Sequence, residues 1–166
     1  MSEFELNSDA FDDDGLLPEA HEKISPPLRW TDPPAGTRSL ALVVEKQPKL
    51  HTPWEESLAT EPVTYWLAWG LPPHAGSLDA GVSLLREGRS SSGALGYTPT
   101  RPPAYKRRVL LFRMLALSDE LTLARGATRA ELMQATLGLV LAEADLRVRW
   151  DPGRPRWYER LGRLLR

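Results

Sequence analysis

Proline is the feature that most restricts how this chain can fold. Proline accounts for 15 of the 166 residues, about 9% of the chain where about 5% is usual. A proline inside a helix removes a hydrogen bond and clashes with the preceding turn, so this composition argues against a helix bundle. Prolines between strands cost little. The length suits a single domain, and we expect its prolines to lie in the connections between strands.

Apolar runs between the prolines predict the strands of this domain. Three runs are short, apolar and rich in β-branched or aromatic side chains: residues 39–44 (SLALVV), 63–71 (VTYWLAWGL) and 107–117 (RRVLLFRMLAL). The stretches between them are rich in glycine, proline and polar residues, which favour turns. We therefore expect loops over residues 1–36, 46–62 and 88–103.

Helix signals are confined to the last third of the chain. Thr128 and Glu131 fit a capping box, and apolar residues follow with a period near 3.6 as far as Val140. Residues 146–150 alternate apolar and basic side chains, as in a half-buried strand. A segment from Pro155 carries its apolar residues on one helical face. The sequence predicts a mostly β protein with one or two helices near the C-terminus.

The sequence contains no recognisable catalytic apparatus. Cysteine is absent, which excludes thiol nucleophiles and cysteine-ligated metals. The phosphate-loop, dinucleotide, serine-elbow and zinc-protease motifs are absent as well. The three histidines, His21, His51 and His74, lie in turn-rich segments without ligand spacing, and the acidic run 12–14 precedes a glycine, as in a solvated turn. We expect a non-enzyme with no cofactor and no metal.

Charge is unevenly distributed although the net charge is only −1. Residues 1–32 carry nine acids, and residues 147–166 carry seven arginines. These ends could pair with each other or with another copy of the chain in a homodimer, or they could be two solvated faces. The near-zero net charge argues against nucleic acid as a partner. Because the N-terminus is acidic and no apolar run is long enough for a membrane segment, we expect a cytoplasmic protein.

Several ordered segments resemble the phosphatidylethanolamine-binding protein family, in its bacterial Raf-kinase-inhibitor-like subgroup. Residues 24–30 resemble I-S-P-P-L-x-W, and residues 36–42 resemble G-T-x-S-L-A-L. Residues 88–103 and 126–144 resemble later segments of the same family, and the similarity covers about residues 5–149. This resemblance implies a β-sandwich with a small anion-binding pocket near one end.

The pocket is where this sequence departs from the family pattern. By resemblance, the pocket aspartate position holds Pro48, and the two pocket histidine positions hold Tyr65 and Arg108. In relatives, a glycine-rich segment borders the pocket. This chain keeps two residues of that segment, and the residues after them differ from the family pattern and include an arginine. These three further pocket positions are Gly96, Tyr97 and Arg101.

Two interpretations of the altered pocket remain open. Arg108, together with Arg101, could pair with phosphate or carboxylate, because a guanidinium is a permanent cation with a bidentate fork. The protein would then be a carrier or sensor of an anionic small molecule. Alternatively, Arg108 points to solvent and the pocket is vestigial, filled by Tyr65 and the loop 46–62. The protein would then be a non-catalytic regulator that acts through protein contacts.

The chain divides into a family-like domain over residues 1–150 and a basic extension over residues 151–166. The extension departs from the family pattern and is amphipathic if helical. Such a segment can lie on an anionic membrane, cap a partner, or pack on its own domain or on a second copy. Because its apolar face is short, we expect packing on its own domain or on a second copy.

Overall fold

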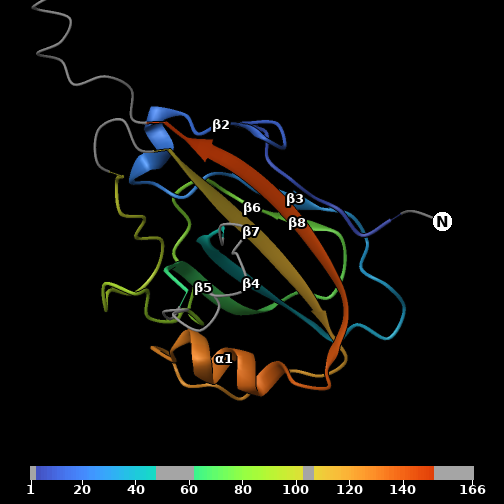
Figure 1. Cartoon of the computed structure of the whole chain (residues 1–166). Coiled ribbons are helices and arrows are strands. Elements are labelled where there is room, and N and C mark those ends of the chain that lie inside the picture. The colour runs from blue at the N-terminus through green and yellow to red at the C-terminus, as the bar shows by residue number, and fades with distance from the viewer. Residues whose placement is uncertain (1–2, 48–61, 103–106, 152–166) are drawn as a thin grey trace, which may run out of the picture.

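A computed structural model describes residues 3–47, 62–102 and 107–151 of the chain. These residues form two sheets and a single α-helix, α1 (Arg129–Thr136) (Figure 1). The large sheet has the strand order β2-β8-β7-β4-β5. Its strands are β2 (Gly15–Leu16), β4 (Ser39–Lys46), β5 (Thr64–Leu71), β7 (Arg108–Leu117) and β8 (Val140–Trp150).

The three central pairings of the large sheet are antiparallel, and short β2 joins the far edge in parallel with β8. β4 is buried over almost its whole length because strands flank it on both sides and apolar layers cover both of its faces. β7 and β8 cross the molecule as its two longest strands (Figure 1).

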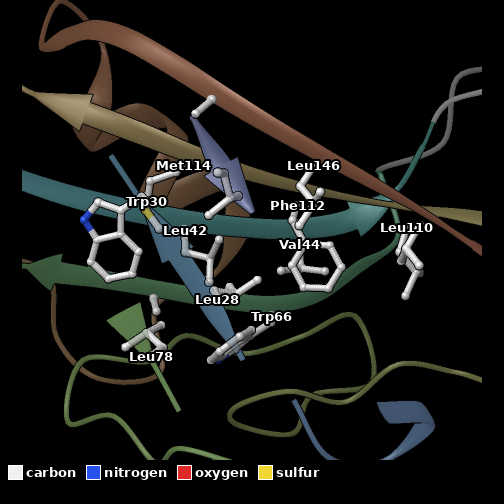
Figure 2. Close-up of a cluster of buried hydrophobic side chains, with 14 of the residues drawn as sticks. Leu28, Trp30, Leu42, Val44, Trp66, Leu78, Leu110, Phe112, Met114 and Leu146 are labelled. Carbon is white, nitrogen blue, oxygen red and sulfur yellow. The ribbon is translucent and has the colours of Figure 1, made fainter. Parts of the chain in front are cut away.

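A small sheet covers one face of the large one. It contains β1 (Leu6–Asn7), β3 (Leu28–Trp30) and β6 (Gly76–Leu78), in the order β1-β3-β6. Side chains from both sheets meet in one buried cluster, here named core 1. Figure 2 shows part of it: Leu28, Trp30 and Leu78 from the small sheet, with Leu42, Val44, Trp66, Leu110, Phe112, Met114 and Leu146 from the large one.

The opposite face of the large sheet is covered by α1 and the segment that leads into it. A second buried cluster, core 2, lies there, and Leu132 of α1 packs in it against alternate residues of the strands. Thr128 caps the helix, since its side-chain oxygen accepts a hydrogen bond from the Glu131 N–H at 3.2 Å. The predicted cap at Thr128 is therefore confirmed, but the reciprocal half of the capping box is not formed, because the Glu131 carboxylate accepts from the Thr128 hydroxyl at 3.2 Å and not from the Thr128 N–H.

The mostly β fold class and the three long apolar strands are confirmed, but two boundaries were wrong. The helix ends at Thr136 and does not continue to Val140, because Leu137 leaves the helical region and Gly138 follows with φ +76°. The last strand begins at Val140 and not at Leu146. Its first residues are exposed, so they lack the strict apolar alternation that the prediction used.

The N-terminal stretch was predicted as loop, and this was also wrong in part. Residues 1–36 contain β1, β2, β3 and a short 3-10 helix, η1 (Glu19–Glu22). Each strand has only two or three residues, too few for a pattern to show in the sequence. The predicted helix from Pro155 and most of the loop 46–62 lie outside the described residues. Within the described residues, no helix is long and apolar enough to cross a bilayer.

Candidate functional site

A β-bulge places Tyr65 at the start of β5. Val44 of β4 pairs with Trp66, and the next residue, Glu45, pairs with Thr64. Tyr65 is thus an extra residue without a partner on β4, and the bulge turns its side chain to the same face as that of Trp66. Both side chains are buried in core 1. Bulges commonly redirect side chains beside functional sites.

Arg108 begins β7 at the same end of the sheet. It pairs across the strands with Trp150, the last residue of β8. Its Nη1 donates to the Tyr65 hydroxyl at 3.1 Å and to the Thr100 carbonyl at 3.0 Å. The guanidinium group therefore turns inward over the end of core 1, so the sequence interpretation in which Arg108 points to solvent is wrong.

The segment that follows Gly96 closes the site beside Tyr65. The Thr98 N–H donates to the Tyr65 carbonyl at 2.8 Å, and the Tyr97 hydroxyl donates to the His21 carbonyl at 2.8 Å. The Tyr97 ring also meets Trp66 edge-on, with centroids 5.7 Å apart. Burial, and secondarily the charge of Glu22, raise the pKa of the Tyr97 phenol well above its usual value. Tyr97 therefore stays a neutral donor.

Two carboxylates that were not predicted as site residues lie beside the site and contact its side chains. Glu22, at the end of η1, accepts from the Trp150 indole N–H at 3.0 Å, and its other oxygen lies 3.6 Å from the Arg101 guanidinium. The site therefore contains the Glu22 carboxylate beside its two arginines. The signal for Glu22 was weak, because it is one of nine acids in a stretch read as a solvated surface.

Glu87 is the second such carboxylate, and it is buried behind the site. One of its oxygens accepts from the Trp66 indole N–H at 3.3 Å and from the Leu84 N–H at 3.3 Å. Gly96 packs against the other oxygen: a Cβ at Gly96 would lie 3.2 Å from it, and the glycine has φ +82°. The one indication of Glu87 in the sequence was its position directly before the Gly88-Arg89 motif.

The structure brings most of the predicted site residues together. Tyr65 and Arg108 are in direct contact, Tyr97 packs on the neighbouring Trp66, and Arg101 reaches the site through Glu22. Gly96 leaves room for the Glu87 carboxylate. Pro48 and His51 lie outside the described residues. Within the described residues, no cluster of acids and histidines could hold a metal ion.

The Tyr65–Arg108 contact combines a cation with a hydroxyl group. A guanidinium donates several hydrogen bonds and stays charged at every physiological pH, and a phenol adds a neutral donor. Such a pair offers hydrogen-bond donors and one positive charge at the end of the large sheet.

The fold and the site together define a class: a two-sheet β protein with a small polar site at one end of its main sheet. Residues 7–151 match the family model described as phosphatidylethanolamine-binding protein. The chain belongs to the phosphatidylethanolamine-binding protein family. The resemblance seen in the sequence is thus confirmed.

The chain is similar to proteins from archaea and bacteria. It is 32% identical over 152 residues to a UPF0098 protein of Methanothermobacter thermautotrophicus, covering 85% of this chain and 94% of the relative. A UPF0098 protein of Chlamydia trachomatis is 31% identical over 150 residues, with 86% and 95% covered.

Two solved structures are similar to the chain. One is a putative phosphatidylethanolamine-binding protein homologue, CT736, from Chlamydia trachomatis, with a TM-score of 0.77 and 28% identity, covering 89% of this chain and 97% of that one. The other is YbcL of E. coli, a member of the same family by its description, with a TM-score of 0.75 and 19% identity, covering 90% and 99%. The second likeness concerns the fold alone.

Proposed function

We propose that this protein is a non-catalytic binding protein that holds a small anionic ligand at the Tyr65–Arg108 site. The observation that carries the proposal is the inward position of the Arg108 guanidinium, 3.1 Å from a buried tyrosine hydroxyl. A guanidinium held at a half-buried strand end is more effective toward an anion than an exposed one, because water screens it less.

The charges around the site support an anion rather than a cation. Among the described residues, Arg108 and Arg101 carry two positive charges, and both carboxylates are already engaged: Glu22 by Trp150 and Arg101, and the buried Glu87 by the Trp66 indole and the Leu84 N–H. A phosphate or carboxylate group would pair with Arg108 and accept from the Tyr65 hydroxyl. The ligand class is therefore a phosphate- or carboxylate-bearing small molecule, and the protein would act as its carrier or sensor.

Isothermal titration with inorganic phosphate and with phosphoethanolamine tests this proposal. Arg108→Met removes the inward guanidinium, and Arg107→Met is the matched control. The Arg107 side chain is 78% exposed and pairs only at the surface, 3.4 Å from Asp151. Each variant loses one positive charge, and the two substituted positions are adjacent in the sequence.

We expect at least one probe to bind the wild-type protein, and Arg108→Met to weaken that binding at least about tenfold. The Arg107→Met variant should bind as the wild type does. If neither probe binds below about 10 mM, or if both variants weaken binding equally, the site is vestigial and the proposal is wrong.

A second candidate function is regulation through protein contacts, including a homodimer. One observation favours it: Leu137, Val140 and Leu141 are exposed within five positions, where α1 ends and β8 begins. Light scattering over a concentration series tests for self-association, which Leu137→Ser with Leu141→Ser should abolish. A cytoplasmic location and the packing of the extension over residues 151–166 stay predictions.

A further inference from the structure

A cavity lies on the face of the large sheet opposite to core 1. It has a volume of about 440 Å³ and is open between the loop after Gly88 and the first turn of α1. Thr64 faces it, whereas Tyr65 faces core 1, because successive residues of a strand point to opposite sides of the sheet. Among the described residues, its walls contain two arginines and no acid: Pro62, Thr64, Arg89, Ser90, Ser91, Gly93, Thr128, Arg129 and Ala130.

The Arg129 guanidinium is fixed at the base of this cavity. Its Nε donates to an oxygen of Glu45 at 2.7 Å, and the two side chains are only 23% and 6% exposed. Among the described residues, the sole buried side-chain nitrogen without a partner is that of Trp69. The terminal nitrogens of Arg129, which have no partner in the described part of the chain, therefore reach solvent. Since Arg129 lines the cavity, they are available to a ligand there.

The Arg89 guanidinium is held by the opposite wall. Its Nη1 donates to the Gly93 carbonyl at 2.9 Å, which bends the loop around the side chain. The Arg89 N–H donates to the Ala127 carbonyl at 2.9 Å, so the loop is tied to the residue that precedes the cap of α1. Gly126 leaves room for the guanidinium: a Cβ there would contact its Nε at 3.5 Å.

Ser91 adds a hydroxyl to the same wall. Its Oγ accepts from the Thr64 N–H at 2.8 Å, and its own N–H donates to the Thr64 carbonyl at 2.9 Å. Because the oxygen acts as an acceptor inside the protein, the hydroxyl proton remains available for donation. The cavity thus combines two positioned guanidinium groups with a hydroxyl donor.

We propose that this cavity is a second oxyanion site, which binds the phosphate group of a small molecule between Arg89 and Arg129. In the part of the chain that the structure describes, the two acids next to the cavity are already engaged, Glu45 by Arg129 and Glu131 by Thr128. Two guanidinium groups suit a phosphate, which accepts several charge-assisted hydrogen bonds. The volume falls in the range of small-molecule sites, about 300–1,000 Å³, so the phosphate would be carried on an organic group.

Amide NMR titration of the full chain tests this site apart from the Tyr65–Arg108 site. The probes are inorganic phosphate, glycerol 3-phosphate and, as a neutral control, glycerol. We expect the Ser91 and Gly93 amides to shift and saturate with both phosphates but not with glycerol. Glycerol 3-phosphate should bind more tightly than the inorganic ion.

Arg89→Met should weaken this binding at least about tenfold. Arg125→Met is its matched control, because Arg125 is exposed nearby and does not line the cavity. Arg108→Met should leave the Ser91 and Gly93 shifts unchanged, so loss of the first site and loss of this one are separable. The proposal is overturned if the shifts do not saturate, or if Arg125→Met weakens binding as much as Arg89→Met does.

Arg129 needs a paired variant, since removing it alone leaves the Glu45 charge buried without a partner. Glu45→Gln with Arg129→Met removes both charges together. We expect this pair to weaken phosphate binding as Arg89→Met does while the rest of the amide spectrum remains dispersed. Unchanged phosphate affinity in the folded paired variant would exclude Arg129 from the site and overturn the proposal.

Discussion

At the scale of single residues, the two positions matched to the family's pocket histidines carry side chains of different chemistry in this chain. By resemblance, Tyr65 and Arg108 stand where relatives carry histidines. A histidine side chain can switch charge near neutral pH, whereas a guanidinium offers a bidentate fork of donors and a phenol offers one hydroxyl. The direct 3.1 Å contact between the two side chains makes them one unit of the proposed site. The strength of this unit is open to a direct energetic test.

Tyr65→Phe removes the hydroxyl and leaves Arg108 with its bond to the Thr100 carbonyl. We expect phosphate affinity to fall by about three- to tenfold, the effect of one lost hydrogen bond. In a double-mutant cycle with Arg108→Met, measured by isothermal titration, the two effects should be non-additive because the residues are in contact. Purely additive losses would mean that the ligand does not contact the pair as a unit.

Tyr97 makes the stability of the protein sensitive to alkaline pH. Its pKa is raised in the folded state, so above about pH 10 the unfolded chain loses the phenolic proton while the folded protein keeps it. The free energy of unfolding should therefore fall as the pH rises through this range. Urea unfolding at a series of pH values should show a smaller alkaline fall for Tyr97→Phe. An identical fall in the variant would contradict the buried, neutral state of Tyr97.

At the scale of elements, the sequence predicted what is long and locally encoded. β4, β5 and β7 carry apolar runs, and the Thr128 cap is a local hydrogen bond, so each leaves a pattern. The strands β1, β2, β3 and β6 have two or three residues and depend on long-range pairing. The bulge at Tyr65 depends on register between strands, which a single chain segment does not reveal. Most predicted site residues were found by resemblance, whereas Glu22 and Glu87 became visible only through their contacts.

The cap of α1 should have a measurable effect on stability. Thr128→Ala removes the acceptor for the Glu131 N–H and is expected to lower the free energy of unfolding by about 1 kcal/mol. Thr122→Ala, at an exposed position outside any helix, should change it by less than about 0.5 kcal/mol. Urea unfolding of both variants provides the comparison. Equal effects would show that the cap contributes nothing specific.

Gly88 is required by a close approach of backbone segments. A Cβ there would lie 2.5 Å from the Ala127 carbonyl oxygen and 2.9 Å from Leu67. Gly88→Ala should therefore destabilise the protein by about 1–3 kcal/mol or more. The control is Gly93→Ala, where a Cβ would meet nothing within 4 Å and only the φ of +87° is unfavourable, at about 1 kcal/mol. A smaller loss of thermal stability for Gly88→Ala than for Gly93→Ala would contradict the described packing.

At the scale of the whole molecule, one large sheet separates two apolar cores and places a cationic site on each face. Tyr65 and Arg108 lie on the face that carries core 1 and the small sheet, and Arg89 and Arg129 lie on the face that carries core 2 and α1. The prolines, which first indicated a β protein, are confined within the described residues to positions outside the strands and α1. The two sites share an end of the sheet because β5 begins with Thr64 and Tyr65, which face opposite sides.

Anomalous diffraction from a crystal soaked in tungstate tests the Tyr65–Arg108 site most directly. Tungstate is a tetrahedral oxyanion like phosphate, and its metal is located without reference to the protein density. We predict an anomalous peak within about 4 Å of the Arg108 guanidinium and beside the Tyr65 hydroxyl, absent from crystals of Arg108→Met. Saturated crystals with no peak beside Arg108 would show that this site does not bind an oxyanion.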